Sequence, residues 1–339
     1  MNQLPEKIYE RLIKYEIINS DSILISHTNN VLDLENLKSS KGVFFNSKRI
    51  NSIRYINKFH EKVNSILADN GYYITCARTL ENRTAKIKKT LPFGLNNLFI
   101  LFDFIFNRVI PKLPFLKKIY FFISKGKNRI LSLTEILGRL ISCGFLIVEY
   151  FEEDDLTYII SKKIKEPSFD ANASYGPLFK MKRVGYKGKI IYIYKFRTMH
   201  PYAEFLQEGL YNSNLLDSTG DKIKNDFRVT SWGRFFRKFW IDELPQLYNL
   251  IKGDIRLVGV RAVSLAKFKL FNEDLQELRI KIKPGLVPPY YADLPRNFKE
   301  FQESEKKYIL SKIESPLLTD IKYFFRALIN ILFKGARSQ

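Results

Sequence analysis

The sequence predicts an α/β domain over residues 1–165, followed by a compact α+β domain over residues 175–337. The chain has 339 residues, which is enough for two ordinary domains. Helix-like and strand-like periodicities alternate through its first half. Between the halves, KEPSFDANASYGP (165–177) collects Pro, Ser, Asn, Ala and Gly without periodicity, as expected of a domain boundary.

The composition is that of a globular protein with a strong basic excess. With 45% hydrophobic and 27% charged residues, the chain is neither disordered nor fibrous. Its 56 Lys and Arg against 35 Asp and Glu give a net charge of +21. This excess indicates a polyanionic partner, such as nucleic acid, anionic lipid or a phosphorylated substrate, although a lysine-rich proteome gives the same balance. Cys76 and Cys143 have apolar neighbours, so we expect buried, reduced thiols and a cytoplasmic location.

The first domain is expected to contain a helix over residues 51–68. Apolar residues recur near one helical face in this segment, at Ile53, Ile56, Val63 and Ile66. The turn-forming residues 69–71 (Asp-Asn-Gly) are expected to end the helix, and residues 72–76 to form a strand. The first 50 residues have mixed periodicity, and we assign them no role.

A second helix is expected to begin after Ser132, which precedes Glu135 with the spacing of a capping box. Gly144 is expected to end this helix, and strands at 145–150 and 156–164 follow. This order of elements resembles the C-terminal part of the class I methyltransferase fold. The glycine-rich loop that would seat a nucleotide-like cofactor is missing. We therefore expect a degenerate methyltransferase-like α/β domain without a cofactor.

The segment from Leu98 to Ile123 is apolar but broken by prolines, and it carries charges at Asp103, Arg108 and Lys112. The chain has no uninterrupted run of 18 apolar residues and no visible signal peptide. Residues 98–123 could dip into one leaflet of a membrane as a broken helical pair, or pack as two core helices. We favour core helices.

Residues 176–199 predict a β-hairpin, because two runs rich in β-branched and aromatic residues flank a turn at 185–188. Arg183 precedes the turn, and Lys195 and Arg197 end the second strand. The planar fork of arginine suits bidentate phosphate binding, and lysine adds a point charge. On this segment alone, a phosphate-binding hairpin and a solvated basic hairpin are equally good interpretations.

Asp242 and Glu243 form the strongest candidate for chemistry. We expect Asp242 to cap a helix with Pro245 in its first turn and Lys252-Gly253 at its end. A helix N-terminus would keep the aspartate ionised and attract phosphate oxygens. Nearby cations could offset the charge of a diphosphate, namely Arg228, Arg234, Arg237 and Lys238. An isolated Asp-Glu-Leu-Pro would more ordinarily be only a helix cap.

The order of several motifs makes the functional interpretation the stronger one. GPLF, RVG, YKFRTM, DFRVTSWGRFFRK, IDELPQL, KGD, LVG and KPGL, between Gly176 and Ala336, resemble the bacterial sugar transferase family, the monotopic polyprenyl-phosphate phosphoglycosyl transferases. The resemblance implies transfer of a sugar 1-phosphate from a UDP-sugar to polyprenyl (undecaprenyl) phosphate. It also implies a peripheral or monotopic location on the cytoplasmic face of the bacterial inner membrane, where surface polysaccharide synthesis begins.

The resemblance also assigns roles to residues. Asp242 would attack the sugar-linked phosphorus, expel UMP and form a covalent phosphosugar intermediate. Glu243 would help to hold Mg²⁺. Substrate contacts are expected from six cations: Arg183, Lys195, Arg197, Arg228, Arg234 and Arg261.

The sequence departs from the family pattern in three places. Val260 and Ala262 replace the usual prolines beside Arg261, and residues 286–291 predict a different acceptor or sugar pocket. Residues 151–175 are polar where the family has a re-entrant membrane helix. Candidate membrane contacts are therefore residues 98–123 and IKYFFRALINILFKGAR near the end, the latter equally well a helix that closes the core.

Two classes of function remain open at this stage. The first is an active transferase; the second is a catalytically inactive or accessory homologue that acts as a scaffold in an envelope-polysaccharide assembly. A protein partner or homo-oligomer could supply membrane contact in either case. Nucleic acid is not among the partners that we expect.

Overall fold

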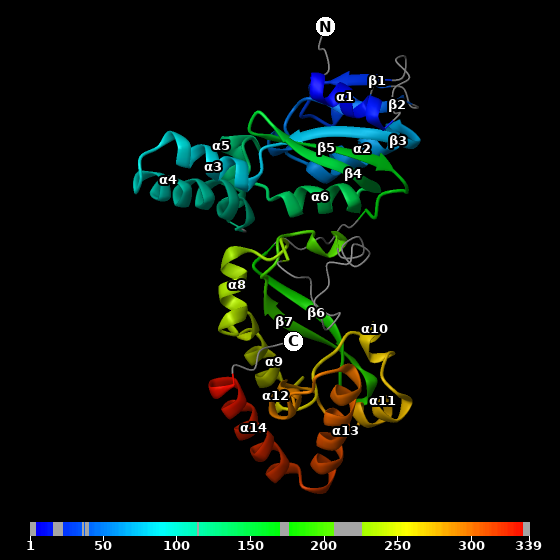
Figure 1. Ribbon diagram of the computed structural model, residues 1–339, viewed down its shortest axis with the longest axis vertical. Coiled ribbons are helices and arrows are strands. Elements are labelled where there is room, and N and C mark those ends of the chain that lie inside the picture. The colour runs from blue at the N-terminus through cyan, green and yellow to red at the C-terminus, as the bar shows by residue number, and fades with distance from the viewer. Residues whose placement is uncertain are drawn as a thin grey trace. The chain divides into compact units, whose positions relative to one another are not determined.

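The computed structural model describes residues 5–15, 23–35, 37, 41–113, 115–169, 176–206 and 226–334. These residues form two compact units (Figure 1). The first unit holds the described residues up to 169 together with 200–206, and the second holds 176–199 and 226–334. Residues 200–206 thus follow the hairpin in sequence but belong to the first unit.

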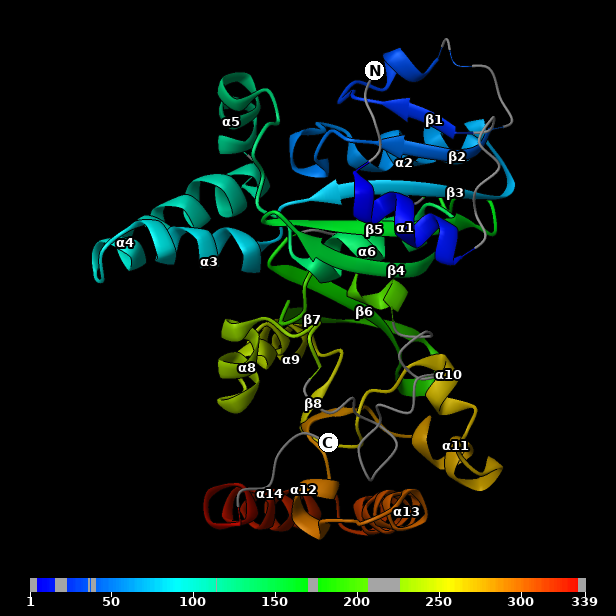
Figure 2. The same ribbon diagram turned by 45° about the horizontal axis from the view of Figure 1, so that its top comes forward.

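A five-stranded mixed sheet organises the first unit, in the order β1-β2-β3-β5-β4 (Figure 2). The strands β1 (Ile23–Ser26), β2 (Lys41–Asn46) and β3 (Leu67–Ala77) are parallel. The strand β5 (Leu156–Lys163) is antiparallel both to β3 and to β4 (Phe145–Glu153). The carboxyl ends of three parallel strands therefore meet at one edge of the sheet.

Helices cover both faces of this sheet because the side chains of its central strands alternate. One face of β2 and β3 places Phe44 and Tyr73 in a core with α2 (Ile56–Ile66) and α6 (Leu133–Ser142). The other face buries Phe45 and Ile74 against α1 (Glu6–Lys14). Such burial of both faces explains why these strands are apolar throughout.

Most expected elements of this unit are present. The helix α2 and the strands β4 and β5 lie within or close to the predicted ranges. Residues 69–71, expected as a turn after the helix, instead lie inside β3. Asn70 has a left-handed φ of 64°, and the register with β2 shifts between Lys41 and Val43, so the chain accommodates turn-forming residues as an irregularity within a long strand.

The two cysteines agree with the sequence-based expectation. Cys76 and Cys143 are buried and free. Burial disfavours the thiolate and raises the pKa of each thiol to about 12. Both therefore behave as small apolar core groups.

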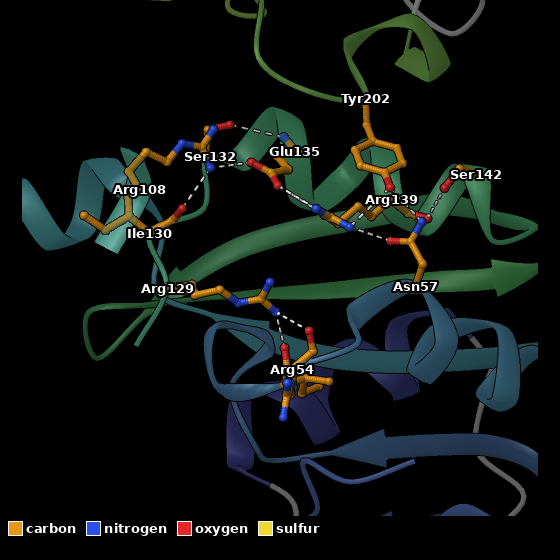
Figure 3. A network of polar contacts seen from close by, with 11 residues as sticks. Arg54, Asn57, Arg108, Arg129, Ile130, Ser132, Glu135, Arg139, Ser142 and Tyr202 are labelled. Atoms are coloured by element: carbon orange, nitrogen blue, oxygen red, sulfur yellow. Dashed lines mark hydrogen bonds and ion pairs between the residues drawn. The ribbon is translucent and has the colours of Figure 1, made fainter. Parts of the chain in front are cut away.

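The capping of α6 is only half that of a capping box. The hydroxyl of Ser132 accepts a hydrogen bond from the Glu135 N–H at 3.2 Å. The Glu135 carboxylate, however, points to Arg108 and Arg139 and not back to the helix start (Figure 3). Burial opposes its ionisation, but the two guanidinium groups hold the pKa of Glu135 well below its usual range.

A set of helices projects beside the sheet in Figures 1 and 2. It consists of α3 (Leu80–Thr90), α4 (Leu95–Phe104), a π-helical turn (Ile105–Val109) and α5 (Leu116–Ser124). We call residues 93–124 the apolar arm. The only buried residue of α4 is Asn96, and the only one of α5 is Tyr120. The expectation that residues 98–123 form core helices is therefore wrong, because most of their apolar side chains face outward.

The second unit begins with the expected hairpin, β6 (Leu178–Val184) and β7 (Ile190–Phe196), paired from Leu178–Phe196 to Val184–Ile190. The helices α8 (Ser231–Lys238) and α9 (Gln246–Lys252) follow. The strands β8 (Arg256–Val258) and β9 (Gly285–Val287) form a parallel pair, and the remaining helices lie between and after these strands in the sequence. These helices are α10 (Leu265–Phe268), α11 (Glu273–Arg279), α12 (Tyr290–Asp293), α13 (Phe298–Glu314) and α14 (Pro316–Phe333).

The C-terminal helix α14 closes the core of the second unit. Its buried residues include Tyr323 and Ala327, which join the cluster built on Tyr308 and Val258. Its other face stays exposed and apolar, at Leu317, Leu318, Ile321, Phe325, Leu328, Ile329, Leu332 and Phe333. Gly335 and Ala336, the last residues of the motif pattern, lie outside the described residues.

Short turns of 3-10 helix complete the fold, at Leu32–Leu34, Ile50–Ser52, Ile110–Lys112, Tyr186–Gly188, Ala203–Leu206 and Ile241–Glu243. Within the described residues, every helix is too short or too polar to cross a membrane.

Candidate active site

Asp242 and Glu243 lie on the 3-10 turn Ile241–Glu243, between α8 and α9. Trp240 has a left-handed φ of 54°, which stops α8 and redirects the chain. The expectation that Asp242 caps a helix is wrong, because α9 starts only at Gln246 and has Pro245 as its N-cap. The acidic pair therefore occupies a tight 3-10 turn of its own, which ends before α9 begins.

Lys195 brings the hairpin to this turn. Its Nζ lies 2.6 Å from Glu243 Oε1 and 4.0 Å from Asp242 Oδ2. Asp242 is 9% exposed, and Lys195 and Glu243 are partly buried. The predicted catalytic pair and one of the predicted substrate-binding cations therefore form one cluster.

The pKa of Asp242 is raised above its ordinary value. Burial is the main cause, and the adjacent Glu243 carboxylate adds to it, whereas Lys195 and Arg237 act in the opposite direction. This corrects the expectation that a helix N-terminus keeps the aspartate ionised. The ionised form depends on nearby cations.

Arg237, which the sequence analysis named only as a nearby cation and not as a substrate contact, acts directly on the acidic turn. It acts electrostatically on both Asp242 and Asp226, and its Nε donates to the hydroxyl of Thr198 at 2.9 Å. Arg237 lies about one helical turn before Ile241–Glu243 in the sequence. This spacing could have identified Arg237 as a neighbour of the acidic pair, because α8 ends just before that segment.

Arg228 is buried and already engaged. Its Nε donates to Asp226 Oδ1 at 2.9 Å and its Nη2 donates to Asp226 Oδ2 at 2.8 Å. Hydrogen bonds from Arg228 hold the pKa of Asp226 below its ordinary value despite burial. Arg228 therefore stabilises the turn that precedes α8, and sequence reasoning did not identify Asp226 as its partner.

The other predicted cations are distributed differently. Arg197 Nε donates to the Gly176 carbonyl at 3.0 Å. Arg183 and Arg261 lie near enough that burial and the second charge together lower the pKa of Arg183. Arg234 is exposed on α8, and no hydrogen bond or ion pair joins it to the acidic pair within the described part of the chain. The structure thus groups Lys195 with the acidic pair and Arg183 with Arg261.

Tyr291 was also missed by sequence reasoning. It accepts a hydrogen bond from Trp240 Nε1 at 3.2 Å, directly before the acidic turn. It lies in the segment 286–291 that departs from the family pattern. A residue of the segment that departs from the family pattern therefore contacts Trp240, two residues before Asp242.

The residues present fit Mg²⁺ in a limited way. Among the described residues, no group of three or more His, Cys, Asp or Glu side chains could hold a metal ion. Asp242 and Glu243 offer two carboxylates, and Mg²⁺ is commonly held by one or two carboxylates together with substrate phosphates. The site suits a metal that arrives with a diphosphate.

Comparison with known proteins identifies a family for the second half of the chain. A family model described as bacterial sugar transferase matches residues 169–334. The galactosyl transferase CpsE of Streptococcus agalactiae is 35% identical over 164 residues, covering 48% of this chain and 36% of that protein. The undecaprenyl-phosphate galactose phosphotransferase of Salmonella typhimurium is 40% identical over 117 residues, covering 33% and 24%.

A third relative is the UDP-glucose:undecaprenyl-phosphate glucose-1-phosphate transferase of Klebsiella pneumoniae, which is 35% identical over 117 residues and covers 34% of this chain and 23% of that protein. The chain thus spans between about a quarter and about a third of the length of these three relatives.

The comparisons do not confirm the methyltransferase-like resemblance of the first unit. A structure of the pyocyanin biosynthetic protein PhzM is 14% identical and covers 38% of this chain and 32% of that chain, with a TM-score of 0.23. So low a score carries no argument about fold or function.

Proposed function

Because residues 169–334 belong to the bacterial sugar transferase family, we propose that this chain transfers a sugar 1-phosphate from a UDP-sugar to polyprenyl phosphate. The observation that carries the proposal is the cluster of Asp242, Glu243 and Lys195. The names of two relatives contain undecaprenyl phosphate, and one also contains UDP-glucose. The product would begin a surface polysaccharide on the cytoplasmic face of the bacterial inner membrane.

In the first step, an Asp242 carboxylate oxygen forms a bond to the sugar-linked phosphorus. The bond from this phosphorus to the bridging oxygen breaks, and UMP leaves with the electron pair. In the second step, a phosphate oxygen of the polyprenyl phosphate attacks the same phosphorus. The bond to Asp242 then breaks and the carboxylate is restored.

The cations of the site serve this chemistry in two ways. Lys195 and Arg237 favour the ionised carboxylate of Asp242 against the effect of burial. They also lie where they can offset charge on a bound diphosphate. Mg²⁺, held by Glu243 together with the diphosphate, would neutralise charge on the leaving group.

A polyprenyl acceptor requires contact with a membrane, and the apolar arm is suited to provide it. Its exposed large apolar residues are Phe93, Leu95, Leu98, Phe99, Leu101, Phe102, Ile105, Phe106, Leu113, Phe115, Leu116, Ile119, Phe122 and Ile123. So many outward apolar side chains on one structural feature are unusual for a surface in water.

Charge points to an anionic bilayer as the partner of the arm. Exposed lysines accompany the apolar residues, at Lys88, Lys89, Lys117, Lys118 and Lys125. The one acid of the arm is Asp103, and Arg83 pairs with it at 2.5 Å. Apolar groups flanked by lysines are typical of helices that lie in the interface of an anionic membrane.

The test is UMP release from a panel of UDP-sugars, with full-length protein in native-membrane vesicles that contain polyprenyl phosphate and Mg²⁺. Asp242→Asn should lower UMP release at least about a thousandfold, because an amide cannot act as the nucleophile. The matched control is Asp274→Asn, which changes a largely exposed aspartate of the same unit.

Asp242→Asn should fold normally, because a buried carboxyl with a raised pKa tolerates a neutral side chain of the same size. Retained UMP release in this variant would overturn the assignment of the nucleophile. No release by folded wild-type protein with any UDP-sugar would overturn the transferase and favour the accessory role.

A further inference from the structure

The first unit has a crevice at the carboxyl ends of its parallel strands. Open α/β sheets bind ligands in this position. Two cavities of about 370 Å³ each adjoin there, and both are lined by Arg49 and Asn128. Arg49 follows β2, and Arg78 follows β3 and lines the first cavity. We call the two cavities the strand-end crevice.

The lining of the strand-end crevice is strongly basic. Its cations are Lys48, Arg49, Arg78, Arg83, Lys86 and Lys127, and no carboxylate of the described residues lines either cavity. Arg83 pairs with Asp103, and Lys86 pairs with Asp155 at 2.9 Å. For the other four cations, the described residues offer no ion pair within 4.0 Å. Their positive charge is therefore not neutralised by a direct ion pair, and only Arg78 is influenced by a carboxylate farther away, that of Asp155, among the described residues.

Arg78 is the most constrained of these cations. The Asn51 side chain accepts from the Arg78 N–H at 2.7 Å and donates to the Arg78 carbonyl at 2.8 Å. The Arg78 Nε is buried and has no hydrogen-bond partner among the described residues. A buried N–H without a partner is unfavourable, and an acceptor oxygen of a bound ligand would satisfy it.

The ends of the neighbouring strands are equally well held. The Asn46 side chain accepts from the Thr28 N–H at 3.2 Å and donates to the Thr28 carbonyl at 3.0 Å, which joins the ends of β1 and β2. The Ser47 hydroxyl lies 2.7 Å from His27 Nδ1. The cations therefore extend from a rigid edge, unlike lysines dispersed over a solvated surface.

We propose that the strand-end crevice binds a ligand that carries a phosphate or diphosphate group. Two arginines on a fixed frame provide planar forks for phosphate oxygens. The cavity volume is in the range of small-molecule sites. Phe99 of the apolar arm also lines the first cavity, so the phosphate could belong to a soluble molecule or to a lipid headgroup.

The primary experiment is calorimetric titration of full-length protein with inorganic pyrophosphate. Arg49→Gln and Arg78→Gln should each weaken binding at least about tenfold, because each removes charged hydrogen bonds. Lys58→Gln is the control, since it removes an exposed charge from the same unit outside the crevice. Arg49→Lys keeps the charge but loses the fork, and should give an intermediate affinity.

A second measurement distinguishes a soluble phosphate ligand from a lipid headgroup. Vesicles of phosphatidylglycerol are floated with each variant, with phosphatidylcholine vesicles as the uncharged comparison. Tight pyrophosphate binding indicates a soluble ligand, whereas arginine-dependent flotation without pyrophosphate binding indicates a lipid headgroup. The proposal is overturned if both readouts are the same for wild type, Arg49→Gln and Arg78→Gln. UMP release is not measured, so the outcome is independent of the transferase activity.

Discussion

At the scale of single residues, the carboxyl group of Asp242 lies in an environment that disfavours its ionised form. Burial and Glu243 raise the pKa of Asp242, and Lys195 and Arg237 limit the rise. The nucleophile proposed above must be ionised to react, so we expect activity to fall as the pH drops through this raised pKa. Lys195, which the hairpin places 4.0 Å from Asp242, thus helps to keep Asp242 ionised.

Lys195→Gln tests this dependence. Without the ammonium group, the pKa of Asp242 rises further, and the acid limb of the pH profile of kcat/KM moves to higher pH. Activity at neutral pH should also fall about a hundredfold or more, because a group that stabilises the diphosphate is lost. The measurement is UMP release across a pH series.

The control for this measurement is Lys189→Gln, an exposed lysine of the same hairpin. It should leave both the acid limb and the activity at neutral pH unchanged. An acid limb at the same pH in wild type and Lys195→Gln would show that Lys195 does not set the charge state of Asp242.

Residue-scale prediction from the sequence succeeded where the signal was local. Alternation placed Lys195 at the end of the predicted hairpin, and the hairpin is present as expected. The substrate contact of Lys195 was implied by the family resemblance and stays a prediction. The turn of Asp242 was missed because it depends on the left-handed conformation of Trp240, which favours glycine or asparagine and which no residue of this segment indicates. Tyr291 was missed because its partner is distant in the sequence.

At the scale of elements, the apolar arm shows that apolar periodicity predicts helices but not what their apolar faces contact. The helices were predicted, but an apolar run looks the same whether it meets a protein core or a membrane. The structure decides that most of this surface faces outward. Because α4 and α5 expose apolar side chains next to exposed lysines, we expect them to lie within the interface of an anionic bilayer.

Phe102→Glu with Phe122→Glu tests the role of the arm. Both side chains are largely exposed, at 72% and 86%, so the changes should leave folding intact. Charges in place of two inserted rings should weaken flotation with phosphatidylglycerol vesicles by about tenfold or more. Leu32→Glu is the control, since Leu32 is 61% exposed on the same unit outside the arm.

Equal flotation of the double variant and Leu32→Glu would show that the arm does not insert. If the wild-type protein does not float but forms dimers that the double variant loses, a second copy of the chain covers the arm instead. Both measurements use the same preparations, because flotation and sedimentation need only folded full-length protein.

At the scale of the whole molecule, a buried polar network joins segments that are far apart in the sequence. Glu135 pairs with Arg108 of the apolar arm and with Arg139 of α6. Arg139 in turn donates to Asn57 at 2.6 Å and to the Tyr202 hydroxyl at 3.3 Å, with its guanidinium 4.4 Å from the Tyr202 ring (Figure 3). Residues 200–206 are thereby held in the first unit.

Gly138 explains why this attachment is close. A Cβ at this position would lie 2.3 Å from the Tyr202 carbonyl oxygen, so only glycine permits the approach. The sequence indicated Glu135 only as a capping residue, because the capping motif is local and its arginine partners are not. Long-range ion pairs of this kind leave no periodic pattern.

Glu135→Gln should lower the stability of the first unit by about 3–5 kcal/mol at pH 7, because two buried guanidinium groups lose their counter-charge. Hydrogen–deuterium exchange of peptides from α6 and residues 200–206 measures the free energy of opening. Glu152→Gln, an exposed glutamate of β4, is the control.

The folded pKa of Glu135 is depressed, so its stabilisation is complete above its unfolded pKa of about 4.3 and is lost as the pH falls toward the folded value. In urea unfolding, the difference between wild type and variant should therefore shrink below this pH, and a difference that is absent at pH 7 or constant with pH would contradict the role of the network.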